Sequence, residues 1–200
     1  MSRLRPQGDT GQAFPVYITV AAGLLFLALA FLAVGQAAVN RSGAQTAADA
    51  AALAAAQNRR DQLAGKWVED VLDPTEWAAV FDGDVASLKP SCWRADQLAA
   101  QNDASADCAS LDPLTFAVTA VTRKSVGTSV VPGTEKYKST ATAKAVIEAR
   151  CTFDPPTGDG GGADDTLPSL NCKGRRWDLD PDHLTDLPGP TDLFDVHLVG

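Results

Sequence analysis

One apolar segment of about 22 residues, from Phe14 to Gly35, constrains the rest of the chain more than any other feature. It contains no charged residue, and its only polar side chains are those of Tyr17 and Thr19. A helix of this length covers the roughly 30 Å of hydrocarbon in a bilayer, since each residue adds about 1.5 Å. Residues 14–35 are therefore predicted to form a single transmembrane helix.

A cleavable secretory signal is the competing interpretation of this segment. Ala33-Val34-Gly35 would then provide the small-residue cleavage site. The apolar core of such signals is about 7 to 15 residues long. The longer run found here favours an anchor that is retained.

Charge predicts the orientation of the span. The leader, residues 1–13, contains Arg3 and Arg5 against Asp9, whereas the chain beyond the span has 15 basic and 24 acidic residues. Positively charged flanks stay in the cytoplasm. We therefore expect a cytoplasmic leader, a single pass through the cell membrane and an extracytoplasmic C-terminal part. That part is acidic, so nucleic acid is not an expected partner.

The next segment, residues 36–62, is an alanine-rich stem with high helix propensity and no proline. It lacks a broad stripe of large apolar side chains. Small residues recur in two rows of four-residue spacing, which are Gly43, Ala47, Ala51 and Ala55, and Ala44, Ala48, Ala52 and Ala56. Such rows let helix backbones approach closely. We expect the stem to pack against helices of other subunits, copies of this chain among them; a plain spacer helix is the alternative.

Residues 63–200, which we call the head, are long enough for one small domain. Leu63, Trp67 and Val71, with Val68 and Leu72 one step round, form an apolar helix face that would dock on this domain. Residues 73–76, Asp-Pro-Thr-Glu, have the form of a helix start and predict a short second helix. Asp82-Gly83-Asp84 would close that helix.

Strand patterns occur in the second half of the chain. Residues 114–122 and 126–131 are rich in β-branched side chains, and residues 138–151 alternate between polar even positions and small or apolar odd positions. Residues 194–199 alternate again and predict an edge strand. The expected fold class is α+β, with an antiparallel sheet covered on one side by the stem helix. Residues 154–166, rich in glycine and proline, predict a flexible loop.

All four cysteines, Cys92, Cys108, Cys151 and Cys172, lie in the head. An even number outside the cytoplasm predicts two disulfides. The pairing of sequence neighbours, Cys92 with Cys108 and Cys151 with Cys172, is the simplest of three connectivities, and free buried thiols are the alternative. Zinc is not favoured, because no Cys-x-x-Cys pair is present. The interval between Cys92 and Cys108 predicts a short helix followed by a loop.

Catalysis is not expected from this composition. The chain has two histidines, His183 and His197, and no Gly-x-Ser-x-Gly, phosphate-loop or dinucleotide motif. His197 lies on the polar side of its predicted strand, which favours a surface role. We therefore expect neither an enzyme nor a bound cofactor.

Three aspartates, Asp178, Asp180 and Asp182, have the alternate spacing of calcium loops. A helix-loop-helix calcium site also needs glycine at its sixth position and glutamate at its twelfth. Those positions hold His183 and Gly189. A solvated acidic turn is therefore favoured over a metal site.

Two stretches around the span carry a family resemblance. They are residues 11–17, Gly-Gln-Ala-Phe-Pro-Val-Tyr, and residues 40–54, Asn-Arg-Ser-Gly-Ala-Gln-Thr-Ala-Ala-Asp-Ala-Ala-Ala-Leu-Ala. With the span between them, they resemble the N-terminal module of TadE/TadG-like proteins in their short actinobacterial form. Members of this family are membrane-anchored pilin-like or assembly components of the tight-adherence (Flp-type) pilus system. The resemblance implies a pilin-like arrangement and partners among other pilus subunits.

Two departures narrow what the resemblance implies. Prepilins carry glutamate at the fifth position after the cleavage glycine, and counting from Gly11 this position is Val16. Longer TadG-type members also carry a metal-binding Asp-x-Ser-x-Ser motif, which this chain lacks. The favoured hypothesis is a non-enzymatic pilus-assembly component. The alternative is an anchored module whose acidic loops bind a ligand or the cell wall.

Overall fold

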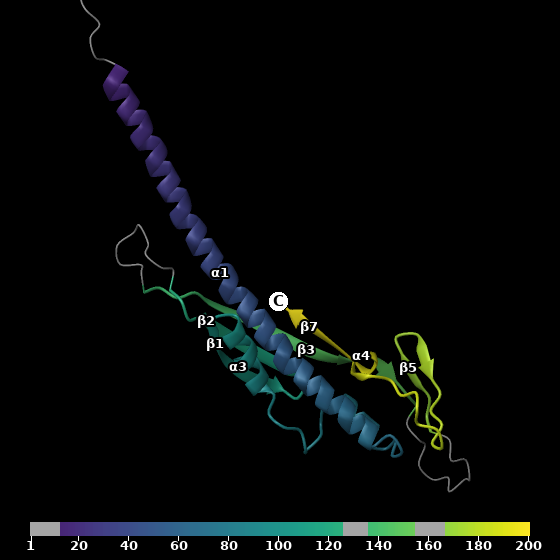
Figure 1. Ribbon diagram of the computed structural model, residues 1–200. Coiled ribbons are helices and arrows are strands. Elements are labelled where there is room, and N and C mark those ends of the chain that lie inside the picture. Colours follow the sequence, from purple (N-terminus) through teal and green to yellow (C-terminus); the bar gives the residue numbers. More distant parts are fainter. Residues whose placement is uncertain (1–12, 126–135, 155–166) are drawn as a thin grey trace, which may run out of the picture.

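The computed structural model describes residues 13–125, 136–154 and 167–200 of the chain. Its largest element is one continuous helix, α1 (Ala13–Glu69, 57 residues). Figure 1 shows that one half of α1 extends away from the other elements, while its second half is covered by them. The helix passes without a break from the stem into the head, because alanine-rich sequence without proline favours its continuation.

The main sheet has four antiparallel strands in the order β1-β2-β3-β7. Their bounds are Ala104–Asp112 for β1, Thr115–Thr122 for β2, Thr140–Ala149 for β3 and Phe194–Val199 for β7. The last three strands confirm the sequence prediction, including the place of β7 at an edge. The strand predicted at residues 126–131 lies outside the described residues, as do nearly all residues of the predicted flexible loop.

Strand β1 was not predicted. Its sequence, Ala-Ser-Ala-Asp-Cys-Ala-Ser-Leu-Asp, has no β-branched residue, so its local propensity for a strand is low. It nevertheless pairs with β2 from Ala104 opposite Thr122 to Asp112 opposite Thr115. Pairing with a strongly strand-forming neighbour outweighs propensity here.

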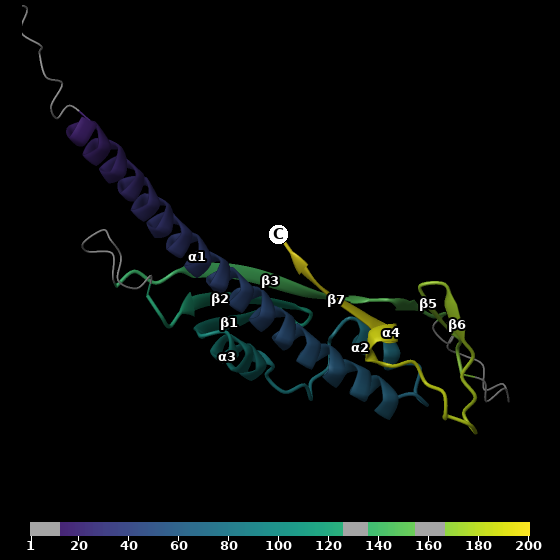
Figure 2. The ribbon, with the colours of Figure 1, turned by 45° about the horizontal axis from the view of Figure 1, so that its top comes forward.

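The alternation predicted for β3 is confirmed. Ala143, Ala145 and Ile147 are buried, whereas Thr142 before them and Lys144 between them are exposed. The buried face of the sheet is covered by two helices, α1 and α3 (Cys92–Gln101), which lie side by side over it in Figure 2. The head is therefore a two-layer α+β structure with the helices on one face of the sheet.

A second, smaller sheet lies at the end of the head that is farther from the exposed half of α1 (Figure 1). It consists of β4 (Cys151–Thr152), β5 (Leu170–Cys172) and β6 (Arg175–Trp177), with the short helix α4 (Pro190–Leu193) leading into β7. Strands of two or three residues leave no readable pattern in a sequence, and these were not predicted.

The predicted second helix is present as α2 (Trp77–Phe81). It begins later than expected, because Asp73 accepts hydrogen bonds from the backbone and hydroxyl of Thr75 and forms a turn first. Gly83 ends the helix with a φ of 74°.

Aromatic side chains close the core where α1 ends. The ring centroids of Trp67 and Trp77 are 5.5 Å apart, and those of Phe81 and Phe194 are also 5.5 Å apart. Phe153 lies 5.3 Å from Trp77 in an edge-to-face arrangement. Burial of Leu63, Trp67 and Val71 confirms this part of the predicted docking face. Val68 and Leu72 were predicted wrongly, since both are exposed: Val68 points away from the core, and Leu72 lies in the turn after α1.

Both predicted disulfides are present. Cys92 at the start of α3 is bonded to Cys108 in β1, and Cys151 in β4 is bonded to Cys172 in β5. None of the four cysteines is a free thiol, so that alternative was wrong. The first bond ties a helix to the edge strand of the main sheet, and the second joins neighbouring strands of the small sheet.

Candidate functional site: the exposed half of the N-terminal helix

The first half of α1 presents large apolar side chains to its surroundings. Phe14, Phe26 and Phe31 are exposed, with Phe31 at 82% of its maximal surface, and so are most of the leucines between them. The helix is long and apolar enough to cross a membrane, and within the described residues no part of its most apolar stretch is buried. A helix belonging to the core of a water-soluble domain would be covered, so exposure distinguishes this half of α1 from such a helix.

The few polar groups in this half are suited to an apolar environment. The hydroxyl of Thr19 donates within the helix, where the carbonyl oxygens of Pro15 and Val16 both lie at 2.9 Å. A hydroxyl bonded in this way does not require water. Tyr17 lies near the helix start, where an amphipathic ring suits a membrane surface. Arg3 and Arg5, predicted to set the orientation, lie outside the described residues.

The second half of α1 is enclosed by the head. Its fully buried alanines are Ala44, Ala47, Ala48, Ala51, Ala52, Ala55 and Ala56. They contact β2, β3 and α3. Their small side chains let the α1 backbone approach a sheet on one side and a helix on the other. Gly43, at the edge of this region, is exposed, and an added Cβ there would meet open space.

This arrangement changes what the small-residue rows can do. The sequence interpretation assigned them to the helices of other subunits, but in the structure the chain's own head occupies them. The part of the stem that faces outward is a narrow strip, with exposed Thr46 and Gln57 and half-buried Ala50 and Leu53 near its centre. Asp49 at its border accepts a hydrogen bond from Gln45 at 2.8 Å. Contacts between α1 and other helices therefore have to use this strip or the exposed half.

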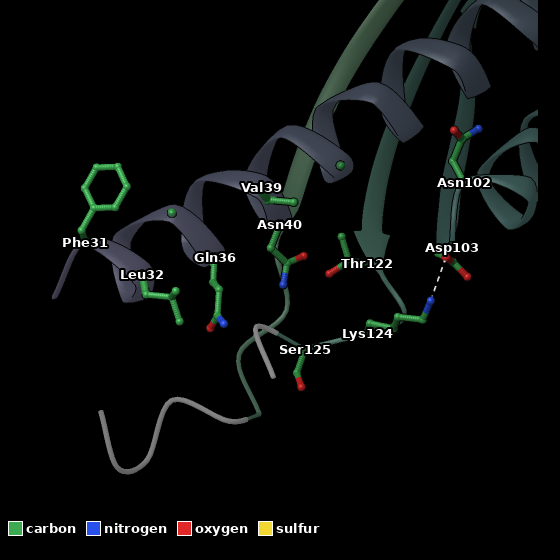
Figure 3. A pocket seen from close by; sticks show the side chains of 12 residues that line it. Phe31, Leu32, Gln36, Val39, Asn40, Asn102, Asp103, Thr122, Lys124 and Ser125 are labelled. Carbon is green, nitrogen blue, oxygen red and sulfur yellow. Dashed lines mark hydrogen bonds and ion pairs between the residues drawn. The ribbon is translucent and has the colours of Figure 1, made fainter. Parts of the chain in front are cut away.

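A groove lies where α1 leaves the head. Its helix side is formed by Phe31, Leu32, Gln36, Val39 and Asn40, and its head side by Asn102, Asp103, Thr122, Lys124 and Ser125 (Figure 3). Phe31 and Leu32 belong to the end of the predicted span, and the head-side residues come from the α3–β1 turn, the end of β2 and the residues that follow β2. The groove thus brings the head next to the predicted membrane boundary.

Hydrogen bonds fix the head side of this groove. The Asn102 side chain donates to the Leu98 carbonyl at 2.8 Å and caps α3. Asp103 follows with a φ of 54°, and its carbonyl accepts from the Arg123 N–H at 2.7 Å. The ammonium of Lys124 lies 3.0 Å from the Asp103 carboxylate. The turn after α3 and the end of β2 therefore form one connected surface.

The aspartates with calcium-like spacing are engaged by their own chain. Asp178 accepts from Arg176 at 2.8 Å, and Asp180 accepts from the Asp182 N–H at 2.9 Å. The Asp182 N–H, and next the His183 ring, lower the pKa of the Asp180 carboxyl. Over the described ranges, no cluster of three or more potential metal ligands is placed to hold an ion.

The second histidine lies on the outer face of the main sheet. His197 is 3.6 Å from the Asp195 carboxylate and 3.8 Å from that of Glu148. Both neighbours are acidic surface groups, so this arrangement resembles a surface ion-pair cluster more than a nucleophile with its base.

Comparison with known families identifies the N-terminal segment. Residues 11–58 match the family model of Flp pilus-assembly TadE/G-like proteins. Over residues 11–58 the chain is therefore similar to TadE/G-like proteins. This TadE/G-like segment is about a quarter of the chain and contains the exposed half of α1 together with its first buried alanines. No curated protein and no solved structure matches the chain.

Proposed function

We propose that this chain is a membrane-anchored, non-enzymatic component of Flp-type pilus biogenesis. Residues 14–35 of α1 are the single-pass anchor, the leader is cytoplasmic and the head lies outside the cytoplasm. One observation carries the proposal: the TadE/G-like segment coincides with the exposed apolar half of α1 and with the alanines that fix this half in the head. The matched segment thus comprises the proposed membrane anchor and the alanines that attach this anchor to the head.

The exposed half of α1 is the surface that we assign to other subunits. Helices in lipid associate through close packing at small residues, since lipid tails are as apolar as leucine. Gly23 and Gly35 lie in this half, and an added Cβ at either position would meet open space. Glycine inside a helix costs about 0.5–1 kcal/mol relative to alanine. Packing within this chain gives no reason for these glycines, whereas a neighbouring helix would.

The test compares variants in cells that assemble the filament. Gly23→Leu adds a large side chain away from the head, and Gly35→Leu adds one beside the groove where α1 leaves the head. At both positions the added Cβ meets open space, so we expect membrane insertion and head folding to be retained and surface filaments to be lost. Leu24→Ile, a conservative change in the same half, serves as the control. Filaments are counted by electron microscopy, and insertion is measured by membrane fractionation.

Two outcomes would contradict the proposal at different points. If deletion of the whole chain leaves filaments unchanged, it has no part in assembly. If deletion abolishes filaments but both glycine variants assemble normally, the chain acts in assembly through a surface other than these glycines. Orientation is tested separately by protease treatment of intact cells, in which a C-terminal tag should be removed and an N-terminal tag should be protected.

A further inference from the structure

Basic side chains are concentrated at the end of the head from which the exposed half of α1 emerges. We call this surface the basic tip, and its members are Arg41 on α1, Arg123 and Lys124 at the end of β2, and Lys136 and Lys138 before β3. Asp103, an acidic residue at this end, pairs with Lys124. This local charge is opposite to that of the chain beyond the span, where acidic residues outnumber basic ones by 24 to 15.

Strand pairing assembles the basic tip. The backbone N–H of Thr122 donates to the Ser139 carbonyl at 3.0 Å, and the Ser139 N–H donates to the Thr122 hydroxyl at 3.1 Å. Antiparallel pairing then places Lys138 beside Arg123. Residues that are far apart in the sequence therefore form one positively charged surface.

The basic tip lies level with the end of the predicted span. Lys124 and Ser125 share a groove with Phe31 and Leu32 (Figure 3), and Arg41 shares a second groove with Thr140 at the start of β3. If residues 14–35 fill the hydrocarbon, these groups fall in the headgroup layer, because that layer begins where the apolar run ends.

The side chains of the basic tip are available to a ligand. The Lys124–Asp103 ion pair is exposed, with 80% and 70% of the two side chains accessible, and such pairs are weakly held. Over the described ranges, no ion pair engages Arg41, Arg123, Lys136 or Lys138. Tyr137, between two lysines, is 67% exposed, and tyrosine is enriched where membranes meet water.

We propose that the basic tip binds the phosphate groups of anionic phospholipids in the bilayer that α1 spans. The ligand is assigned by charge complementarity and by continuity with the anchor, since basic residues next to a span are attracted to anionic lipid. Binding holds the head against the membrane surface and limits its tilt relative to α1. The inference rests on the proposed anchoring of α1 and adds a lipid preference to it.

The experiment uses the full chain in nanodiscs of phosphatidylcholine, with or without phosphatidylglycerol. Hydrogen–deuterium exchange is measured at residues 121–125 and 136–141. We expect exchange there to be slower by about threefold or more in anionic discs, and this difference to disappear at high salt because screening weakens surface charge.

Two matched variants test the assignment. Arg123→Gln/Lys124→Gln/Lys138→Gln removes three charges from the basic tip, and Lys173→Gln/Arg175→Gln/Arg176→Gln removes three from the opposite end of the head. In the first variant, residues 121–125 and 136–141 should exchange at the same rate in both kinds of disc. In the second variant, exchange there should remain slower in the anionic discs. Circular dichroism verifies that both remain folded.

The outcomes separate this inference from the anchor on which it rests. Entry into both kinds of disc with equal exchange overturns the lipid preference and leaves the anchor intact. An equal loss of the lipid effect in both variants also overturns it, because the effect would then follow total charge. Failure to enter either kind of disc overturns the anchor, and the lipid assignment falls with it.

Discussion

The side-chain amide of Gln62 binds both backbone polar groups of Lys89. Its Oε1 accepts from the Lys89 N–H at 2.7 Å, and its Nε2 donates to the Lys89 carbonyl at 3.2 Å. The same Nε2 lies 3.1 Å from the hydroxyl of buried Ser91. One residue of α1 thus holds the connection between α2 and α3, a segment with little regular structure of its own.

Replacing Gln62 with alanine should lower the free energy of unfolding by about 1–3 kcal/mol, because several backbone and side-chain groups lose their partner. Gln57→Ala on the exposed strip of the same helix is the control, and it should change stability by less than about 0.5 kcal/mol. Chemical denaturation of the full chain in detergent measures both. Equal effects of the two changes would show that the Gln62 contacts contribute nothing.

Leucine at a buried alanine should destabilise the head. Ala48→Leu inserts three carbon atoms between α1 and its covering elements, and such overpacking costs about 1–3 kcal/mol. Ala37→Leu makes the same change on the exposed half of α1 and should leave the unfolding transition unchanged. A head as stable with Ala48→Leu as with Ala37→Leu would contradict the packing described here. If Ala48→Leu loses filaments, the first explanation is therefore a destabilised head, and the loss does not show that Ala48 contacts another subunit.

Gly83 and Gly174 form a matched pair, since both have positive φ values of 74° and 89°. An added Cβ at Gly83 would lie 2.8 Å from Leu114 Cδ2 and 2.9 Å from Pro113 Cβ, whereas at Gly174 it would meet open space. We expect Gly83→Ala to cost about 2–4 kcal/mol and Gly174→Ala about 1 kcal/mol. Thermal unfolding of both variants tests this order, and a reversed order would contradict it.

The head needs the stem in order to fold. A fragment of residues 41–200 keeps the buried alanines, and we expect it to be soluble without detergent and to unfold cooperatively. A fragment of residues 63–200 lacks them and exposes the inner face of the sheet, so it should aggregate or lose its near-ultraviolet circular dichroism. A cooperative transition in the shorter fragment would show that the alanines are not part of the core. Binding assays on the isolated head should therefore use the longer fragment.

Asp180 should titrate below the usual aspartate pKa of about 3.9. The Asp182 N–H, and next the His183 ring, lower the pKa of its carboxyl in the folded chain. A lowered folded pKa contributes stability above the unfolded pKa, and this contribution is lost as the pH falls through the folded pKa. Carbon-13 NMR of the carboxyl measures the titration. His183→Ala should leave the pKa lowered because the backbone donor remains, and a return to the ordinary value would refute this order of causes.

Most regular elements were predictable because their patterns are local. The exposed half of α1 follows from an uncharged apolar run, and β2, β3 and β7 follow from β-branched or alternating residues. Strand β1 was not predictable, because Ala104–Asp112 becomes a strand through its neighbour β2 and its bond to α3 through Cys108. The basic tip was missed for a similar reason: net charge averages over the chain, and only strand pairing brings Arg123 beside Lys138.

The sequence by itself determined that this chain has one apolar helix long enough for a membrane, a small-residue stretch after it and a disulfide-bonded α+β head. The tertiary structure decided what the small residues face. A row such as Ala44, Ala48 and Ala52 indicates that another element packs closely against the helix backbone. A sheet and a helix fit against such a row equally well, so the row does not say which of them is the neighbour. The structure shows that the chain's own sheet and α3 fill this space, because they bury the row within one core.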